Sequence, residues 1–184
     1  MRPVIDINDP LFLQQIRTQA IPLEGGLCQC EIRWRDFVEP IPLKIWKGQI
    51  PGEAPNILGA YDHIRLEIHV LNLGKKGNLL SHRGGLEGTV AHEFAHHLAN
   101  LGAMNDLGDW YYTDSHDQQD ALFHKWAPAL GDFYVASKPK EMTAEVFRVI
   151  SGYASSEEWE ANKTFLEEYK NFLQGNEVFK HFLP

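Results

Sequence analysis

The chain has 184 residues, 43% of them hydrophobic, and a formal net charge of −8 at pH 7. A chain of this size can bury one core of its own, so we expect a single domain over residues 1–184. The acidic balance and the scattered Lys and Arg disfavour nucleic acid and anionic membrane as partners. The sequence shows neither a signal peptide nor an apolar run long enough to span a membrane. We therefore expect a cytoplasmic protein or one exported by a route other than Sec.

The first part of the chain predicts one helix followed by two strands. Asp9 is a candidate cap for a helix that continues through Ala20. Strands are expected over 27–34 and 43–47, separated by the turn-prone segment 39–42. Strands followed by helices later in the chain indicate an α+β fold.

The only two cysteines, Cys28 and Cys30, stand at alternate positions of the first predicted strand. A disulfide between such neighbours would be strained. We expect both to be free thiols, with a metal or redox role as the alternative.

Residues 63–70 show the clearest strand pattern, because polar and apolar side chains alternate along them. One face would be buried, and it carries Ile64, Leu66, Ile68 and Val70. The other face would be exposed, and it carries His63, Arg65, Glu67 and His69. As the last strand before the next helix, this segment is a candidate edge strand to which an extended substrate adds by main-chain pairing. Arg65 and Glu67 are therefore candidate substrate-binding residues.

The most informative stretch is residues 89–98, which contain His-Glu-x-x-His in a segment with a helical pattern. At about 100° per residue, His92 and His96 fall on one helix face about one turn apart, so both imidazoles can bind one ion. Glu93 lies beside them, where it could take a proton from a metal-bound water. The layout is that of a zinc hydrolase, and the alternative is two ordinary histidines on a surface helix.

The rest of this helix supports the metal interpretation. An apolar stripe lies nearly opposite the two histidines and consists of Leu86, Val90, Phe94, Leu98 and Leu101. His97 falls on that stripe and is expected to be a core residue. A metzincin would continue with Gly at position 99 and His at position 102, but these positions hold Ala99 and Gly102, so that class is excluded.

A carboxylate from a second helix could supply the third ligand. On the helix predicted from Glu141, that residue shares a face with Glu145 and Arg148, while Met142 and Val146 face the core. Glu141 could bind the metal, and Glu145 could hydrogen-bond a ligand histidine. The alternative is a solvated acidic face with a Glu145–Arg148 ion pair.

Two further segments complete the chain. Residues 107–120 are acidic and aromatic, and we expect a solvated connector there rather than a calcium site. Its Asp114, His116 and Asp117 are the rival donors for the third zinc position. A last helix is expected to begin at Ser155 or Ser156 and to continue to about Gln174.

The spacing of four elements resembles a known family. His-Glu-Phe-Ala-His at 92–96 is followed by Tyr134, by Glu141 seven residues later, and by Glu145 four residues after that. This pattern resembles the gluzincin group of zinc metallopeptidases, which includes the catalytic domain of anthrax lethal factor and the Mlc titration factor A peptidases. The resemblance covers roughly residues 86–150.

The resemblance implies a zincin-like metallopeptidase fold. A small sheet lobe with the active-site helix would occupy residues 1–102, and a helical subdomain with the third ligand would occupy residues 103–184. One Zn²⁺ per chain would be bound, and its ligands would be His92, His96 and Glu141. Glu93 would act as general base, Tyr134 would stabilise the oxyanion, and Glu145 would orient a ligand histidine.

Three functions are compatible with these residues. The first is a zinc-dependent endopeptidase acting on a protein or peptide, either toxin-like or housekeeping. The second is a regulatory or partner-binding protein on a metallopeptidase fold with little or no hydrolytic activity. The third is a structural zinc domain, which needs neither a base nor an oxyanion donor. The presence of both Glu93 and Tyr134 therefore favours the endopeptidase.

Overall fold

The computed structural model describes residues 1–35, 39–72, 85–102, 104, 113–130, 136–154 and 156–184. The chain forms an α+β fold with a mixed sheet, as its element order predicts. It divides into two compact units, residues 1–93 and 94–184, and the boundary lies within helix α2 (Gly85–Leu101). The predicted subdivision placed this boundary after the helix, at residues 102 and 103.

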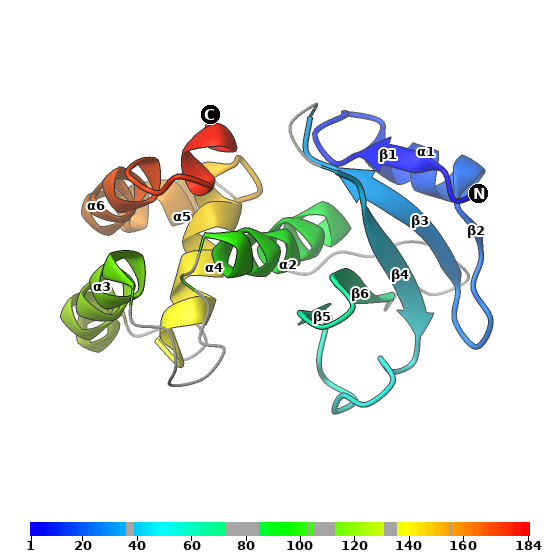
Figure 1. Cartoon of the computed structure of the whole chain (residues 1–184), viewed down its shortest axis with the longest axis horizontal. Coiled ribbons are helices and arrows are strands. Elements are labelled where there is room, and N and C mark those ends of the chain that lie inside the picture. Colours follow the sequence, from blue (N-terminus) through cyan, green and yellow to red (C-terminus); the bar gives the residue numbers. More distant parts are fainter. Residues whose placement is uncertain (36–38, 73–84, 103, 105–112, 131–135, 155) are drawn as a thin grey trace. The chain divides into compact units, whose positions relative to one another are not determined.

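The N-terminal unit contains a six-stranded sheet with the order β1-β3-β4-β6-β5, and β2 pairs with β3 beside this path (Figure 1). The strands are β1 (Val4–Asp6), β2 (Ile21–Pro22), β3 (Cys28–Arg33), β4 (Ile41–Lys47), β5 (Gly59–Asp62) and β6 (Glu67–Asn72). The β1–β3 and β4–β6 pairs are parallel, and the others are antiparallel. The mixed pattern follows from the short hairpins that join β2 to β3 and β5 to β6.

One face of this sheet forms the core of the unit. Cys30 of β3 pairs with Leu43 of β4, which pairs in turn with Ile68 of β6, and all three side chains are fully buried. Because side chains alternate along a strand, these pairs form a continuous apolar row. The strands predicted over 27–34 and 43–47 are confirmed as β3 and β4.

Helix α1 (Phe12–Gln19) contacts β1 and is shorter than predicted. The carboxylate of Asp9 accepts the backbone N–H of Leu11 at 2.8 Å, and the helix begins only at the next residue. Asp9 therefore closes a turn before the helix instead of capping its first residue. Phe12 and Ile16 bury the inner face of α1.

The strand predicted over 63–70 is wrong at its N-terminal half. Asp62 accepts the backbone N–H groups of Ile64 and Arg65 at 2.9 and 3.0 Å, and this turn ends the alternation. Leu66 has φ = 54°, a left-handed conformation that interrupts a strand, and Ile64 is 82% exposed. Strand β6 therefore begins at Glu67.

The predicted edge position of that strand is also wrong. Strand β6 lies between β4 and β5, so the edge of the described sheet on this side is β5. Arg65 belongs to the turn, and Glu67 is buried at 6% exposure instead of facing solvent. Strand β5 forms only through its pairing with β6, which a local pattern does not reveal.

The C-terminal unit is helical and centres on α4 (Pro139–Ile150), shown in yellow in Figure 1. The helices that contact α4 include α3 (Asp114–Leu130), α5 (Ser156–Ala161) and α6 (Lys163–Gln174). A short 3₁₀ helix, η2 (Phe179–His181), packs against α6. Among the described residues, no helix has the length and apolar character needed to cross a membrane.

Two predictions for this unit are corrected. Residues 114–120 open α3 instead of forming a solvated connector, and residues 107–112 lie outside the described residues. The last predicted helix is divided into α5 and α6 at Asn162, whose ψ of 20° departs from helical geometry. Asn is a weak helix former because its side chain competes for backbone hydrogen bonds.

Candidate metal centre

Two groups of three His, Asp or Glu side chains in the described part of the chain have donor atoms close enough to hold one metal ion. The first consists of His92, Glu93 and His96 on α2. The second consists of Asp62, Glu67 and His69 on the β5–β6 hairpin.

The first group is buried on one helix. His92, Glu93 and His96 are 5%, 5% and 8% exposed, and their donor atoms all lie within 4.8 Å of one another. The helix forms as its apolar stripe predicts, because Leu86, Val90, Phe94 and Leu98 are at most 2% exposed. Leu101 is the exception, with 50% exposure near the end of the helix.

A carboxylate from α4 reaches one of these histidines within the C-terminal unit. Glu141 Oε2 lies 3.5 Å from His96 Nε2, and the two side chains are 15% and 10% exposed. A charge-assisted hydrogen bond is normally 2.7–2.9 Å long, so this contact is long for one. Two ligands of a tetrahedral zinc ion, each about 2.0–2.1 Å from it, lie roughly 3.3–3.4 Å apart. The observed separation fits two ligands of one ion.

The position of Glu141 follows from the start of α4. Lys138 is extended and Pro139 occupies the first turn, where a fixed φ and a missing N–H are tolerated. Glu141 is the acidic residue of that turn, where the helix dipole stabilises negative charge. The helix start therefore favours an ionised Glu141.

Glu145 and Arg148 form the predicted ion pair, but they are not solvated. Glu145 Oε2 accepts from Arg148 Nε at 3.2 Å and from Nη2 at 3.0 Å, and the residues are only 6% and 2% exposed. Arg148 also donates to the backbone oxygen of Tyr153. The alternative of a solvated acidic face on α4 is therefore wrong. The role of Glu145 in orienting a ligand histidine stays a prediction.

Gly59, the first residue of β5, lies against the carboxylate of Glu93. A Cβ atom at this position would stand 2.6 Å from Glu93 Oε1 and 2.9 Å from its Cγ. Only a residue without a side chain allows so close an approach of the backbone. Gly59 was not among the predicted site residues, and its one signal in the sequence is a glycine at the start of a strand that the local pattern does not show.

His97 is a core residue, as predicted. It is 4% exposed, its ring centroid lies 5.9 Å from that of Phe94, and burial lowers its pKa to about 4. The imidazole is therefore neutral at physiological pH. His97 packs on the apolar side of α2, away from the chemistry assigned to His92 and His96 by their spacing.

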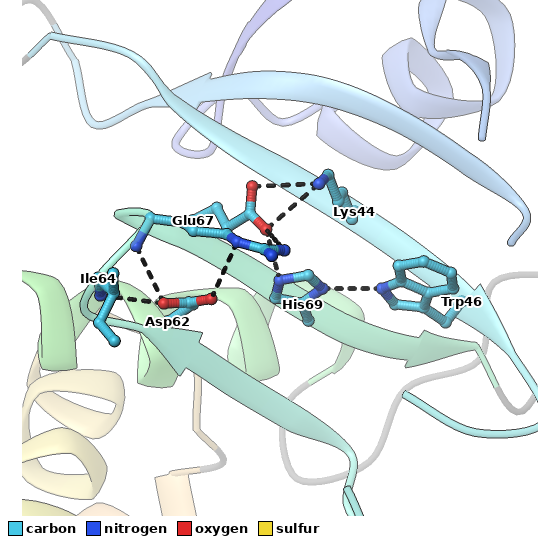
Figure 2. A network of polar contacts seen from close by, with 7 residues as sticks. Lys44, Trp46, Asp62, Ile64, Glu67 and His69 are labelled. Carbon is cyan, nitrogen blue, oxygen red and sulfur yellow. Dashed lines mark hydrogen bonds and ion pairs between the residues drawn. The ribbon is translucent and has the colours of Figure 1, made fainter. Parts of the chain in front are cut away.

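The second group is already part of a hydrogen-bonded network, shown in Figure 2. Lys44 Nζ lies 3.2 Å from each oxygen of Glu67, whose carboxylate is thereby neutralised. Arg65 stands farther away, 3.9 Å from Glu67 and 4.0 Å from Asp62. Two cations thus face two carboxylates, and their charges balance. A divalent ion bound here would add positive charge to a group that is already balanced.

The ring of His69 has no nitrogen to offer a metal. The indole N–H of Trp46 donates to His69 Nδ1 at 2.9 Å, so that nitrogen carries no proton and the neutral ring carries it on Nε2. The Nε2–H group then donates to Glu67 Oε1 at 2.9 Å. Both ring nitrogens are therefore engaged, and the side chain, expected to face solvent, is only 14% exposed. This group stabilises the pairing of β4 with β6.

The remaining candidates do not join either group. Asp114, His116 and Asp117 lie in the first turn of α3, outside both groups of the described residues. Tyr134 lies outside the described residues, so its role stays a prediction. Both thiols are free, as predicted, and burial raises the pKa of Cys30 to about 12, which leaves it protonated and unreactive.

Comparison of the chain with protein-family models, with curated proteins and with solved structures gave no match. Assignment of function therefore depends on the residues and geometry described above.

Proposed function

We propose that this protein is a zinc-dependent endopeptidase with a zincin-like fold, which hydrolyses peptide bonds in a protein or peptide. The observation that carries the proposal is the 3.5 Å separation of His96 Nε2 from Glu141 Oε2. It pairs a carboxylate with one member, His96, of the buried group on α2. One zinc ion per chain would be held by His92, His96 and Glu141.

The donors suit zinc by their chemistry. Two imidazoles and one carboxylate are a common protein ligand set for catalytic zinc, and they leave a fourth position open. A bound zinc ion would lower the pKa of a coordinated water toward about 7 and polarise a substrate carbonyl. The low exposure of His92 and His96 would keep bulk water from competing for the ion.

Glu93 would act as the general base. In this role its carboxylate accepts a proton from the attacking water and later delivers it to the amine nitrogen that leaves. The close approach of Gly59 restricts where the carboxylate can lie. Tyr134 would donate a hydrogen bond to the developing oxyanion, and such a donor is typically worth about 3 kcal/mol.

The substrate would bind as an extended strand along β5. This strand lies at the edge of the described sheet, and an extended peptide can add to a sheet edge by main-chain pairing. Gly59 is part of β5 and adjoins Glu93. Pairing along β5 would therefore bring the substrate backbone near the base. The proposed substrate-binding strand is thus β5 and not the segment 63–70.

The test is Glu93→Ala, measured for both zinc content and peptide hydrolysis. We expect zinc to be retained and hydrolysis to fall on the order of 10²–10⁴-fold, because the base is lost and the ligands remain. Glu87→Ala, an acidic residue elsewhere on α2, is the matched control and should leave both unchanged.

Two other results would assign a different function. A wild-type protein that binds zinc and a partner without any turnover would be a regulatory protein on this fold. A protein whose stability falls on chelation, and whose properties do not change in Glu93→Ala, would contain a structural zinc site.

A further inference from the structure

A buried hydroxyl on α4 joins three helices of the C-terminal unit. Gln119 Nε2 of α3 donates to Thr143 Oγ1 of α4 at 2.7 Å. The same Oγ1 lies 2.5 Å from the hydroxyl of Tyr169 on α6. The three residues are 2%, 1% and 0% exposed, so none of these bonds exchanges with solvent.

The amide of Gln119 reaches α4 at a second point. Gln119 Nε2 lies 3.4 Å from the backbone oxygen of Pro139, the first residue of the helix. Pro139 and Thr143 stand on either side of Glu141 in the sequence, within the first turns of α4. One side chain of α3 therefore contacts both ends of the helical turn that carries Glu141.

These bonds limit the movement of α4. A hydrogen bond depends steeply on distance and angle, so a rotation or shift of α4 would weaken its bonds to Gln119 and Tyr169. Burial also raises the pKa of Tyr169, so its hydroxyl keeps its proton and the network does not change with pH in the physiological range. The rotation and the axial position of α4 are thus both fixed at Thr143.

We propose that Gln119, Thr143 and Tyr169 are positioning residues for Glu141. This inference rests on the proposed function, in which Glu141 is a zinc ligand. Thr143 is two residues beyond Glu141, about 200° around the helix, so the network anchors the side of α4 that faces away from the ligand. Metal ligands must be held within about 0.5 Å of their working geometry, and anchoring the opposite side achieves this.

The experiment compares zinc affinities of the full chain by competition with a chromophoric chelator, at a temperature where circular dichroism shows each variant folded. Thr143→Val keeps the shape and removes the hydroxyl, and we expect its zinc dissociation constant to rise about 10–100-fold. Thr143→Ser keeps the hydroxyl and should stay within about threefold of wild type. Ile150→Val, at the far end of α4, is a control for apolar destabilisation and should not change zinc affinity.

A second variant covers the case in which Thr143→Val does not fold. Tyr169→Phe removes one bond of the network but leaves Gln119 on Thr143, so a smaller loss of zinc affinity is expected. Equal zinc affinity of wild type, Thr143→Val and Tyr169→Phe would overturn the inference while the proposed function stands. If wild type and Glu141→Ala bind zinc equally weakly, the proposed function fails and the inference fails with it.

Discussion

Helix α2 and the β5–β6 hairpin both bring histidine and carboxylate donors together, but the contacts described for the two groups differ. On the hairpin, Lys44 neutralises Glu67, and Trp46 fixes the ring of His69 with both nitrogens engaged. On the helix, one group near His96 is the carboxylate of Glu141, at a distance that fits the proposed shared ion. Donor composition is therefore a weaker guide to a metal site than the groups that surround the donors.

The largest difference between the two groups should appear when one histidine is removed from each. His96→Ala removes a proposed ligand, so zinc affinity should fall by more than about 100-fold. His69→Ala removes a hydrogen-bonding residue, so zinc affinity should not change. Isothermal titration with zinc measures both. Loss of zinc affinity in His69→Ala would mean that the hairpin group, and not α2, binds the metal.

A smaller loss of activity is expected from a substitution at Gly59, the residue of β5 that lies against Glu93. Gly59→Ala places a Cβ 2.6 Å from Glu93 Oε1, so the carboxylate must move while the fold needs little adjustment. We expect hydrolysis to fall about 10–100-fold because misplacing a catalytic group by about 1 Å has this effect. Zinc content should not change. Unaltered kcat in Gly59→Ala would show that Gly59 does not determine the position of the Glu93 carboxylate, and Ala60→Ser in the same strand is the control.

The smallest effect concerns the stability of the hairpin network. Glu67→Gln removes the charge that Lys44 and the His69 N–H contact, so the free energy of unfolding should fall by about 1–3 kcal/mol. Urea denaturation measures this loss, and zinc content should remain that of wild type. An unchanged midpoint in Glu67→Gln would show that the network does not stabilise the β4–β6 pair.

The sequence predicted the helices better than the sheet edge because helical periodicity is local. The stripe from Leu86 to Leu98 and the face shared by Glu141 and Glu145 could be read from spacing alone. The turn at Asp62 depends on two hydrogen bonds to its side chain, and the alternation of polar and apolar residues continues through it, so the sequence pattern did not show it. Strand β5 and the contact of Gly59 with Glu93 depend on long-range pairing, which no local window contains.

The burial of polar side chains on α4 was the other feature that residue spacing could not predict. The Glu145–Arg148 pair has the spacing of a solvated surface pair, and it is buried only because other helices pack around α4. Gln119 lies near the end of segment 107–120, which was expected to be a solvated connector, so its contact with Thr143 could not be anticipated. The burial of the ion pair and the contact of Gln119 with Thr143 both depend on tertiary packing, which the residue pattern of one helix does not show.

The most direct test of the central claim is the zinc content of the full chain, purified without added metal or chelator and measured by elemental analysis. We expect one zinc per chain in wild type and none in the variant with both His92→Ala and His96→Ala. A wild-type protein that contains no zinc, and takes up none on reconstitution, would contradict the central claim, as would zinc retained in the double variant.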